Sequence, residues 1–288
     1  MTKTFQKFLG FSLLSLFILS PLGALAHHPV VVQSQQEVIQ VTRSEISKAY
    51  YGELKSDPHV YIIESEDPFN LYVNILVPDI EGQKKDVSAA IIKNGNTEKP
   101  LAVLDGANFE WTKLYEKFGA DNYFVGPEYR GVADAATYEI IVWSSNNDSK
   151  YSLAIGEVED FGFKETVSAL SIIPSLKQNF FEVSPITFIR SPLAWGLIVV
   201  MYILAFIFGF AYRAILKRFA KGTVRGVGKN IGKVGRLVRF AIGVALLLWA
   251  ITTTWSPVTI FFSGFAIFES LFSWCGFYAA LGKNTCPV

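Results

Sequence analysis

The sequence predicts a two-part chain: an exported all-β antiparallel sandwich of jelly-roll type, followed by an α-helical transmembrane region of three spans. Short runs rich in Val, Ile and Tyr alternate with turn-forming residues through the first part. Later, Leu193–Tyr212 is a stretch of 20 residues without a formal charge, long enough to cross a bilayer as a helix. With 51% hydrophobic residues and a net charge of +1, the composition excludes a disordered chain and a basic nucleic-acid arm. No nucleic-acid partner is expected.

Residues 1–26 have the pattern of a secretory signal peptide. Two lysines precede the apolar run Phe8–Leu19, and the small-residue triplet Ala24–Ala26 follows it. The apolar run is too short to cross a hydrocarbon core of about 30 Å comfortably. We therefore expect cleavage before His27; the alternative is an uncleaved anchor helix.

Residues 27–165 are expected to form the exported sandwich. Turn-forming residues recur there at near-regular spacing, which favours an antiparallel sandwich over a parallel α/β sheet. A short helix is expected over Phe109–Phe118, where large apolar side chains recur near helical spacing. Five strands are expected, at Val60–Ile63, Leu71–Val77, Val87–Ile92, Tyr138–Val142 and Tyr151–Ile155.

The remainder of the chain divides by composition into a connector and a membrane region. The apolar connector is interrupted by Pro174. Two spans, Leu237–Trp255 and Val258–Leu281, are expected on either side of a tight Ser-Pro turn. The segments are a juxtamembrane connector at 166–191, a first transmembrane helix at 192–216, a basic amphipathic cytoplasmic loop at 217–236 and a transmembrane hairpin at 237–286.

The near-zero net charge is a cancellation between two regions of opposite sign. Between His27 and Arg190 lie 24 acidic and 14 basic residues, whereas the loop from Arg213 to Arg239 carries nine basic residues and no acid. Short basic loops beside a spanning helix stay in the cytoplasm. We expect a multi-pass protein of a bacterial or archaeal cytoplasmic (inner) membrane. Residues 27–191 are then extracytoplasmic, and the loop at 213–239 and the C-terminus are cytoplasmic, with the loop also contacting the lipid bilayer.

The last fifth of the chain carries an ordered set of polar residues around its apolar runs. Asn230, Gly232, Arg236 and Arg239 precede the first run, and a Trp-Cys-Gly-Phe-Tyr element and an Leu-Gly-Lys-Asn-Thr-Cys element close the second. This pattern resembles the YgaP-like inner-membrane transmembrane domain, with Gly276 where that family often has Pro. The resemblance implies a helical hairpin, a homo-oligomer through its helices and little chemistry. It does not imply sulfur transfer, because no rhodanese-like segment is present.

The exported part has a looser likeness, carried by the rhythm of its strands. The stretches Ser47–Leu54, Val60–Tyr61, Tyr138–Val142 and Lys150–Glu157 resemble bacterial pre-peptidase C-terminal domains and related jelly-roll sandwiches. The resemblance implies a domain that assists another protein or binds an extracellular ligand.

Four residues are the candidates for a site. Glu269 is the sole acid of the membrane region, so it is expected to be protonated, hydrogen-bonded to a serine or threonine of a neighbouring helix or to a dimer mate, or involved in ion movement. Cys275 and Cys286 are either helix-end packing residues or a thiol pair for redox or a soft metal. His27 with its neighbouring imidazole is either an exposed signal-peptide remnant or a copper ligand.

The sequence predicts a binding protein and not an enzyme. No nucleophile elbow, His-bearing metal motif or other catalytic set occurs, so no catalytic residue, cofactor or metal is assigned. The expected function is binding of an unknown extracytoplasmic protein or ligand by the tethered sandwich. The alternatives are an accessory subunit of a transporter or channel and, third, a thiol-based redox protein.

Overall fold

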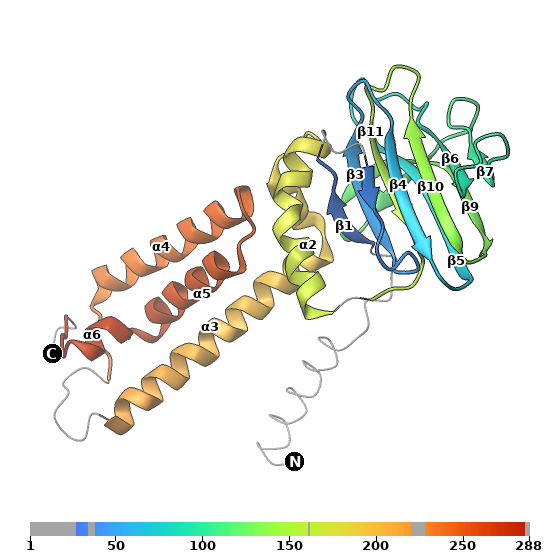
Figure 1. Cartoon of the computed structure of the whole chain (residues 1–288). Helices are drawn as coiled ribbons and strands as arrows, with labels where there is room; N and C mark the ends of the chain where they lie inside the picture. Colours follow the sequence, from blue (N-terminus) through green and yellow to red (C-terminus); the bar gives the residue numbers. More distant parts are fainter. Residues whose placement is uncertain (1–26, 34–37, 161, 220–227, 286–288) are drawn as a thin grey trace, which may run out of the picture.

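The computed structural model describes residues 27–33, 38–160, 162–219 and 228–285, and the predicted signal peptide at residues 1–26 lies outside these ranges. A β-sandwich is joined through a short helical connector to a group of longer helices (Figure 1). The two parts agree with the predicted division into a strand-rich and a helical region.

Two mixed sheets face each other in the sandwich. The first, sheet A, has the strand order β1-β3-β11-β5-β9-β8, and the second, sheet B, has the order β2-β4-β10-β6-β7. The strands are β1 (His28–Val31), β2 (Val38–Gln40), β3 (Lys48–Glu53), β4 (His59–Ser65), β5 (Phe69–Pro78), β6 (Ser88–Lys93), β7 (Ala102–Leu104), β8 (Thr112–Glu116), β9 (Asp121–Ala133), β10 (Ala136–Trp143) and β11 (Lys150–Ile155).

The prediction of a purely antiparallel sandwich is wrong at two edges. β1 pairs with β3 in parallel, and β2 pairs with β4 in parallel, whereas the other ladders are antiparallel. The first four strands alternate between the two sheets, so each parallel pair is joined by a connection that crosses the sandwich. A hairpin joins only antiparallel strands. β1 and β2 have four and three residues, too few for a sequence pattern that would reveal the strands or their parallel pairing.

All five predicted strands are present, as β4, β5, β6, β10 and β11. The predicted helix over Phe109–Phe118 is wrong, because this stretch contains the strand β8, which pairs antiparallel with β9 from Thr112–Val125 to Glu116–Asp121. The apolar side chains of this stretch recur near helical spacing, but the stretch forms a strand because it pairs along its length with the long strand β9. β9 itself was not predicted.

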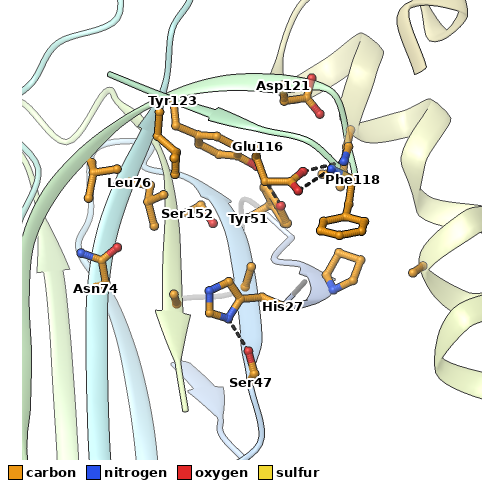
Figure 2. A pocket seen from close by; sticks show the side chains of 18 of the residues that line it. His27, Ser47, Tyr51, Asn74, Leu76, Glu116, Phe118, Asp121, Tyr123 and Ser152 are labelled. Carbon is orange, nitrogen blue, oxygen red and sulfur yellow. Dashed lines mark hydrogen bonds between the residues drawn. The ribbon is translucent and has the colours of Figure 1, made fainter. Parts of the chain in front are cut away.

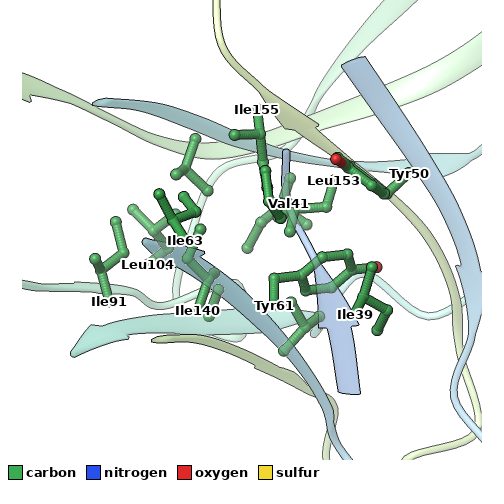
Figure 3. Packing of buried hydrophobic residues seen from close by; sticks show 14 of the residues in the cluster. Ile39, Val41, Tyr50, Tyr61, Ile63, Ile91, Leu104, Ile140, Leu153 and Ile155 are labelled. Carbon is green, nitrogen blue, oxygen red and sulfur yellow. The ribbon is translucent and has the colours of Figure 1, made fainter. Parts of the chain in front are cut away.

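The core lies between the two sheets (Figure 3). Leu71, Val73 and Ile75 of β5 are fully buried and face Ile140 and its neighbours from sheet B. These residues alternate along β5 with side chains that point to the opposite face of sheet A. That opposite face is the one that the connector covers.

The connector is more ordered than the sequence predicted, and it packs on the sandwich. The predicted break at Pro174 falls where an α-helix passes into a π turn, since proline supplies no backbone N–H. Phe180 and Phe181 then pack edge-to-face against Tyr51 of β3. The connector consists of α2 (Phe163–Ser175), the π-helix η1 (Leu176–Phe180) and the 3-10 helix η2 (Pro185–Arg190).

Four helices follow: α3 (Pro192–Phe219), α4 (Lys233–Thr252), α5 (Pro257–Phe272) and α6 (Gly276–Ala280). Among the described residues, α3 and α4 are long and apolar enough to cross a membrane. The expected continuous helix over Val258–Leu281 is not observed, because Ser273 adopts a left-handed conformation with φ of 51° and ends α5. α3 extends to Phe219 and α4 begins at Lys233, so both helices reach into the predicted loop at 217–236.

Candidate functional site

A cavity of about 440 Å³ lies between the outer face of sheet A and the connector (Figure 2). Its lining comes from β1, β3, β5, β8, β9 and β11, from α2 and η1, from loop residues next to these elements, and from Leu193 in the first turn of α3. Small-molecule sites have volumes of about 300–1,000 Å³. The cavity therefore has the size of a ligand site, and it sits where the sandwich meets the helical region.

Strand alternation explains which side chains reach the cavity. Tyr72, Asn74 and Leu76 line it, whereas the intervening residues of β5 point into the core. On β11, Ser152 and Ala154 line it in the same way, and their small side chains leave the space open. Sheet A thus has an apolar inner face and a hollowed outer face.

A β-bulge shapes the floor of the cavity. The register between β5 and β9 shifts between Asn74 and Leu76, next to Pro127, which offers no N–H to the ladder. The buried Asn74 amide instead donates to the carbonyls of Gly126 at 3.3 Å and Pro127 at 3.4 Å. Strands bend at such bulges, and the two residues on either side of this one, Asn74 and Leu76, both line the cavity.

One end of the cavity holds a buried ion pair that joins the connector to the sandwich. Lys177 of η1 donates to the Asp121 carboxylate at 2.6 Å and to the Gly119 carbonyl at 2.5 Å, and its side chain is only 1% exposed. Burial raises the pKa of Asp121 to about 6, although Lys177 opposes that rise. Burial likewise lowers the pKa of Lys177.

Glu116 lies beside this pair and points into the cavity (Figure 2). Its two carboxylate oxygens accept from the backbone N–H groups of Phe118 at 2.6 Å and Gly119 at 2.5 Å. Burial raises the pKa of Glu116, and these hydrogen bonds and nearby Lys177 act in the opposite direction. The carboxylate is therefore held in a fixed orientation at the cavity wall.

His27, a predicted candidate, also lies at the cavity wall. Its Nδ1 is hydrogen-bonded to the Ser47 hydroxyl, and the ring points into the cavity (Figure 2). Burial lowers the pKa of His27, so its imidazole is uncharged at neutral pH. Across the described ranges, no group of three or more His, Cys, Asp or Glu side chains is placed to hold a metal ion.

The opposite rim is polar and more exposed. Arg130 forms an ion pair with Glu157 at 2.7 Å and lies over the ring of Tyr72, 5.1 Å from its centroid. The Tyr72 hydroxyl donates to Glu128 at 3.2 Å. Burial is the main cause that raises the pKa of Tyr72 to about 12, and the negative charge of Glu128 adds to it. None of these residues was among the predicted site candidates, although the polar positions that alternate within Leu71–Val77 were a signal in the sequence.

A second polar cluster lies at the far end of the helical region, away from the sandwich. Glu269 accepts from the Arg239 guanidinium of α4 at 3.1 Å and from the Gly276 backbone N–H at 2.9 Å. The predicted partners of Glu269 were serines or a threonine of a neighbouring helix, or a dimer mate, and Arg239 was not among them. The signal was present, because Arg239 lies about as far before the end of α4 as Glu269 lies after the start of α5.

The other polar residues of this cluster also have structural partners. The Asn230 side chain accepts from the Cys275 N–H at 2.7 Å and donates to the Cys275 carbonyl at 3.0 Å. Arg236 donates to the Ser270 carbonyl at 2.9 Å, near the end of α5. Cys275 is buried and its Sγ accepts from the Tyr278 N–H at 3.5 Å, which caps α6. Cys286 lies outside the described residues.

These contacts join the polar residues on both sides of the α4–α5 hairpin. Residues 227–288 match the family of the inner membrane protein YgaP-like transmembrane domain. This confirms the resemblance drawn from Asn230, Arg236 and Arg239, and with the apolar helices it supports membrane association. In this matched segment, Asn230, Arg236 and Arg239 form hydrogen bonds that connect the N-terminal end of α4 with the C-terminal end of α5 and the residues that follow it. The match covers about a fifth of the chain.

The sandwich has weaker likenesses among solved structures. The pre-peptidase C-terminal domain of a collagenase from Bacillus anthracis is 11% identical, with 42% of this chain and 94% of that chain covered and a TM-score of 0.28. A β-glucosidase from Paenibacillus barengoltzii is 10% identical, with 47% and 14% covered and a TM-score of 0.21. Scores this low carry no functional argument. No curated protein matches the chain.

Proposed function

We propose that this chain is a non-enzymatic inner-membrane protein whose extracytoplasmic sandwich binds a ligand and whose helical part tethers it to the bilayer. The observation that carries the proposal is the cavity between sheet A and the connector. It has the volume of a ligand site and a lining of apolar side chains with a few polar groups among them, the arrangement typical of binding pockets. The lining does place the Ser47 hydroxyl on His27 Nδ1, but within the described ranges no carboxylate hydrogen-bonds that imidazole to orient it as a general base, which favours binding over catalysis.

We propose three spans, with the C-terminus in the cytoplasm. α5 has 16 residues, about 24 Å of helix, so by length alone it is short for a bilayer. Its ends nevertheless align with those of α4: the Ser273 carbonyl accepts from the Asn230 N–H at 2.9 Å, and at the other end a short turn joins the helices. α5 therefore crosses the same layer as α4. The nine bases from Arg213 to Arg239, which lie at the adjoining ends of α3 and α4 and in the segment between them, are then inside.

Native mass spectrometry of the full chain, released from its own membranes, tests the binding function. Ala169 of α2 lines the cavity, and Val167 on the same helix is exposed outside it. Ala169→Phe is expected to fill the space and remove the co-purifying mass, whereas Val167→Phe leaves it in place. Equal amounts of bound mass in both variants, or none in the unaltered chain, would count against a ligand in this cavity.

A second candidate is an accessory subunit of a transporter or channel, with the sandwich as a cap. It is favoured by the contact between the connector and the α4–α5 turn, where the Trp255 indole donates to the Pro185 carbonyl at 2.8 Å and packs on Phe188. This reading predicts a flux that depends on Glu269. A homo-oligomer through the exposed helix faces, and an extracytoplasmic protein partner, belong to either candidate and are tested by cross-linking in native membranes.

A further inference from the structure

The charged groups at one end of the cavity are paired with one another or with the backbone. Lys177 forms an ion pair with Asp121 at 2.6 Å. The carboxylate of Glu116 lies beside this pair and accepts from the backbone N–H groups of Phe118 and Gly119. A ligand group placed at this end therefore meets no charge that still needs a partner.

The charges at the opposite rim are paired in the same way. Arg130 forms an ion pair with Glu157 at 2.7 Å, and Glu128 accepts from the Tyr72 hydroxyl at 3.2 Å. A charged group that entered the cavity would lose its hydration without gaining a counter-charge, which is costly in surroundings of low polarity. The lining therefore favours a ligand that is uncharged.

One hydroxyl of the described lining has no hydrogen-bond partner. Ser152 of β11 is 2% exposed and lies at the cavity wall (Figure 2), and its side chain forms no hydrogen bond with the described residues. Other uncharged polar side chains of the lining are paired, Tyr51 with Tyr123 at 2.9 Å and Ser47 with His27. Because buried polar groups normally have partners, Ser152 is the point of the lining best suited to a polar group of a ligand.

Asn74 of β5 offers a second polar group next to Ser152. Its amide nitrogen donates to the two backbone carbonyls of the β-bulge, and its oxygen accepts no hydrogen bond from the described residues. In the β5–β11 register, Asn74 lies opposite Ala154 and Ser152 lies opposite Leu76, so the two side chains are diagonal neighbours about 7–8 Å apart. A single small group can therefore accept from the Ser152 hydroxyl and donate to the Asn74 oxygen.

Apolar side chains line the cavity between this point and the helical region. Ile173 of α2 and Leu176 of η1 form an aliphatic wall, which Leu193 continues into the first turn of α3. Trp195, in the same turn, is 56% exposed, and membrane proteins place such residues at the bilayer surface. An alkyl chain that lies along this wall therefore runs toward the bilayer.

We propose that the ligand of this cavity is an uncharged single-chain amphiphile, with a hydroxyl head group bound by Ser152 and Asn74 and an alkyl chain bound along Ile173 and Leu193. A hydroxyl both accepts and donates a hydrogen bond, so it can satisfy the two side chains at once. This inference rests on the proposed binding function and specifies its ligand. The same chemistry occurs in a free long-chain alcohol and in a monoacylglycerol of the outer leaflet.

The experiment uses the full chain in phosphatidylcholine nanodiscs and four dodecyl probes that carry a photoreactive diazirine on the chain. The probes differ only in their head group, which is hydroxyl, methyl, ammonium or sulfate. After illumination, the labelled peptides are identified by mass spectrometry, and probe concentrations are compared per lipid of the nanodisc. The hydroxyl probe is expected to label α2 and β11 saturably, at about tenfold lower concentration than each other probe, because only the hydroxyl pairs both side chains without bringing in a charge.

Matched variants separate the chain site from the head site. Ala169→Phe is expected to abolish saturable labelling by every probe, and Val167→Phe to leave it unchanged. Ser152→Ala is expected to reduce the preference for hydroxyl over methyl to about threefold or less, whereas Ser171→Ala, at an exposed position of α2, leaves it in place.

A melting experiment without probe separates binding by Ser152 from a structural role. Because the Ser152 hydroxyl has no partner among the described residues, Ser152→Ala is expected to leave the melting temperature of the full chain unchanged. A lowered melting temperature would show that the hydroxyl supports the fold and would overturn its assignment to the ligand.

The outcomes of labelling distinguish the two levels of the proposal. Saturable labelling that favours a charged probe, or that shows no preference between hydroxyl and methyl, overturns the hydroxyl ligand and leaves the binding function standing. Labelling that Ala169→Phe does not change overturns both. Competition by free dodecanol, compared with competition by monolauroylglycerol added to the nanodisc, distinguishes the two sources of the hydroxyl.

Discussion

Replacement of Lys177 by Met tests how the connector is held on the sandwich. The Lys177 side chain is 1% exposed and ends on the Asp121 carboxylate and two backbone carbonyls of the β8–β9 turn. Met keeps the aliphatic stem that packs in the interface and removes the ammonium group. Asp121, itself 9% exposed in its side chain, is then left as a buried carboxylate without its partner.

The expected cost is large because the pair is buried. Removal of one partner of a buried ion pair typically costs about 3–5 kcal/mol, since the remaining charge keeps its desolvation penalty. Asp121→Asn in addition to Lys177→Met is expected to recover part of this loss, because no buried charge remains. A positive coupling energy from the double-mutant cycle measures the pair itself.

The assay is urea unfolding of a soluble fragment of residues 27–184, followed by circular dichroism. A matched control is Lys84→Met, which removes an ion pair with Asp148 of similar length, 2.8 Å, whose side chains are 43% and 52% exposed. The control is expected to cost less than about 1 kcal/mol. If Lys177→Met costs no more than Lys84→Met, the connector is not anchored by this pair, and the boundary of the cavity needs another explanation.

Three further predictions follow from buried polar groups. Tyr151→Phe is expected to cost about 1–3 kcal/mol, because its hydroxyl bonds two buried groups at 2.7 Å, whereas Tyr115→Phe at the surface is near neutral in the same unfolding assay. Burial raises the pKa of Asp121 in the folded state to about 6, above its ordinary 3.8, so the unfolded chain ionises at a lower pH than the folded chain. The free energy of unfolding is therefore highest below about pH 4 and decreases as the pH rises through 6. The unaltered fragment should lose up to about 3 kcal/mol over this window relative to Asp121→Asn, and parallel pH profiles would contradict the assignment. Glu269→Gln is expected to lower the thermal stability of the full chain in detergent by stranding Arg239, and Arg239→Gln in the same chain to restore part of it; an unchanged melting temperature for Glu269→Gln would refute the pairing.

The strands that could be predicted are those whose own side chains carry the pattern. β5 alternates large apolar residues with polar ones and β10 is rich in β-branched and aromatic residues, and the positions of both strands follow from that. β8 could not be predicted, because its residues Thr112–Glu116 are mostly exposed and become a strand only by pairing with β9. The two parallel edges likewise depend on how the chain crosses between sheets, which local patterns do not encode.

The same division holds for the sites. His27, which the sequence left open as an exposed signal-peptide remnant or a copper ligand, lines a cavity whose other walls come from strands and helices far away in the sequence. Lys177 and Asp121 are 56 residues apart, and nothing local pairs them. The Arg239–Glu269 pair, in contrast, follows from folding an antiparallel hairpin about its turn, and simple register counting would have found it.

The central claim, an extracytoplasmic cavity occupied by a ligand, is tested most directly by thiol labelling with a membrane-impermeant maleimide. Leu114→Cys places a thiol in the cavity lining, and Tyr115→Cys places one on the same strand outside that lining; both positions are partly exposed. In intact spheroplasts, both thiols should be reached from outside. Leu114→Cys should react more slowly in native membranes than after exhaustive detergent washing, whereas Tyr115→Cys should react equally in both. Failure of either thiol to react from outside, or equal protection at both positions, would contradict the account.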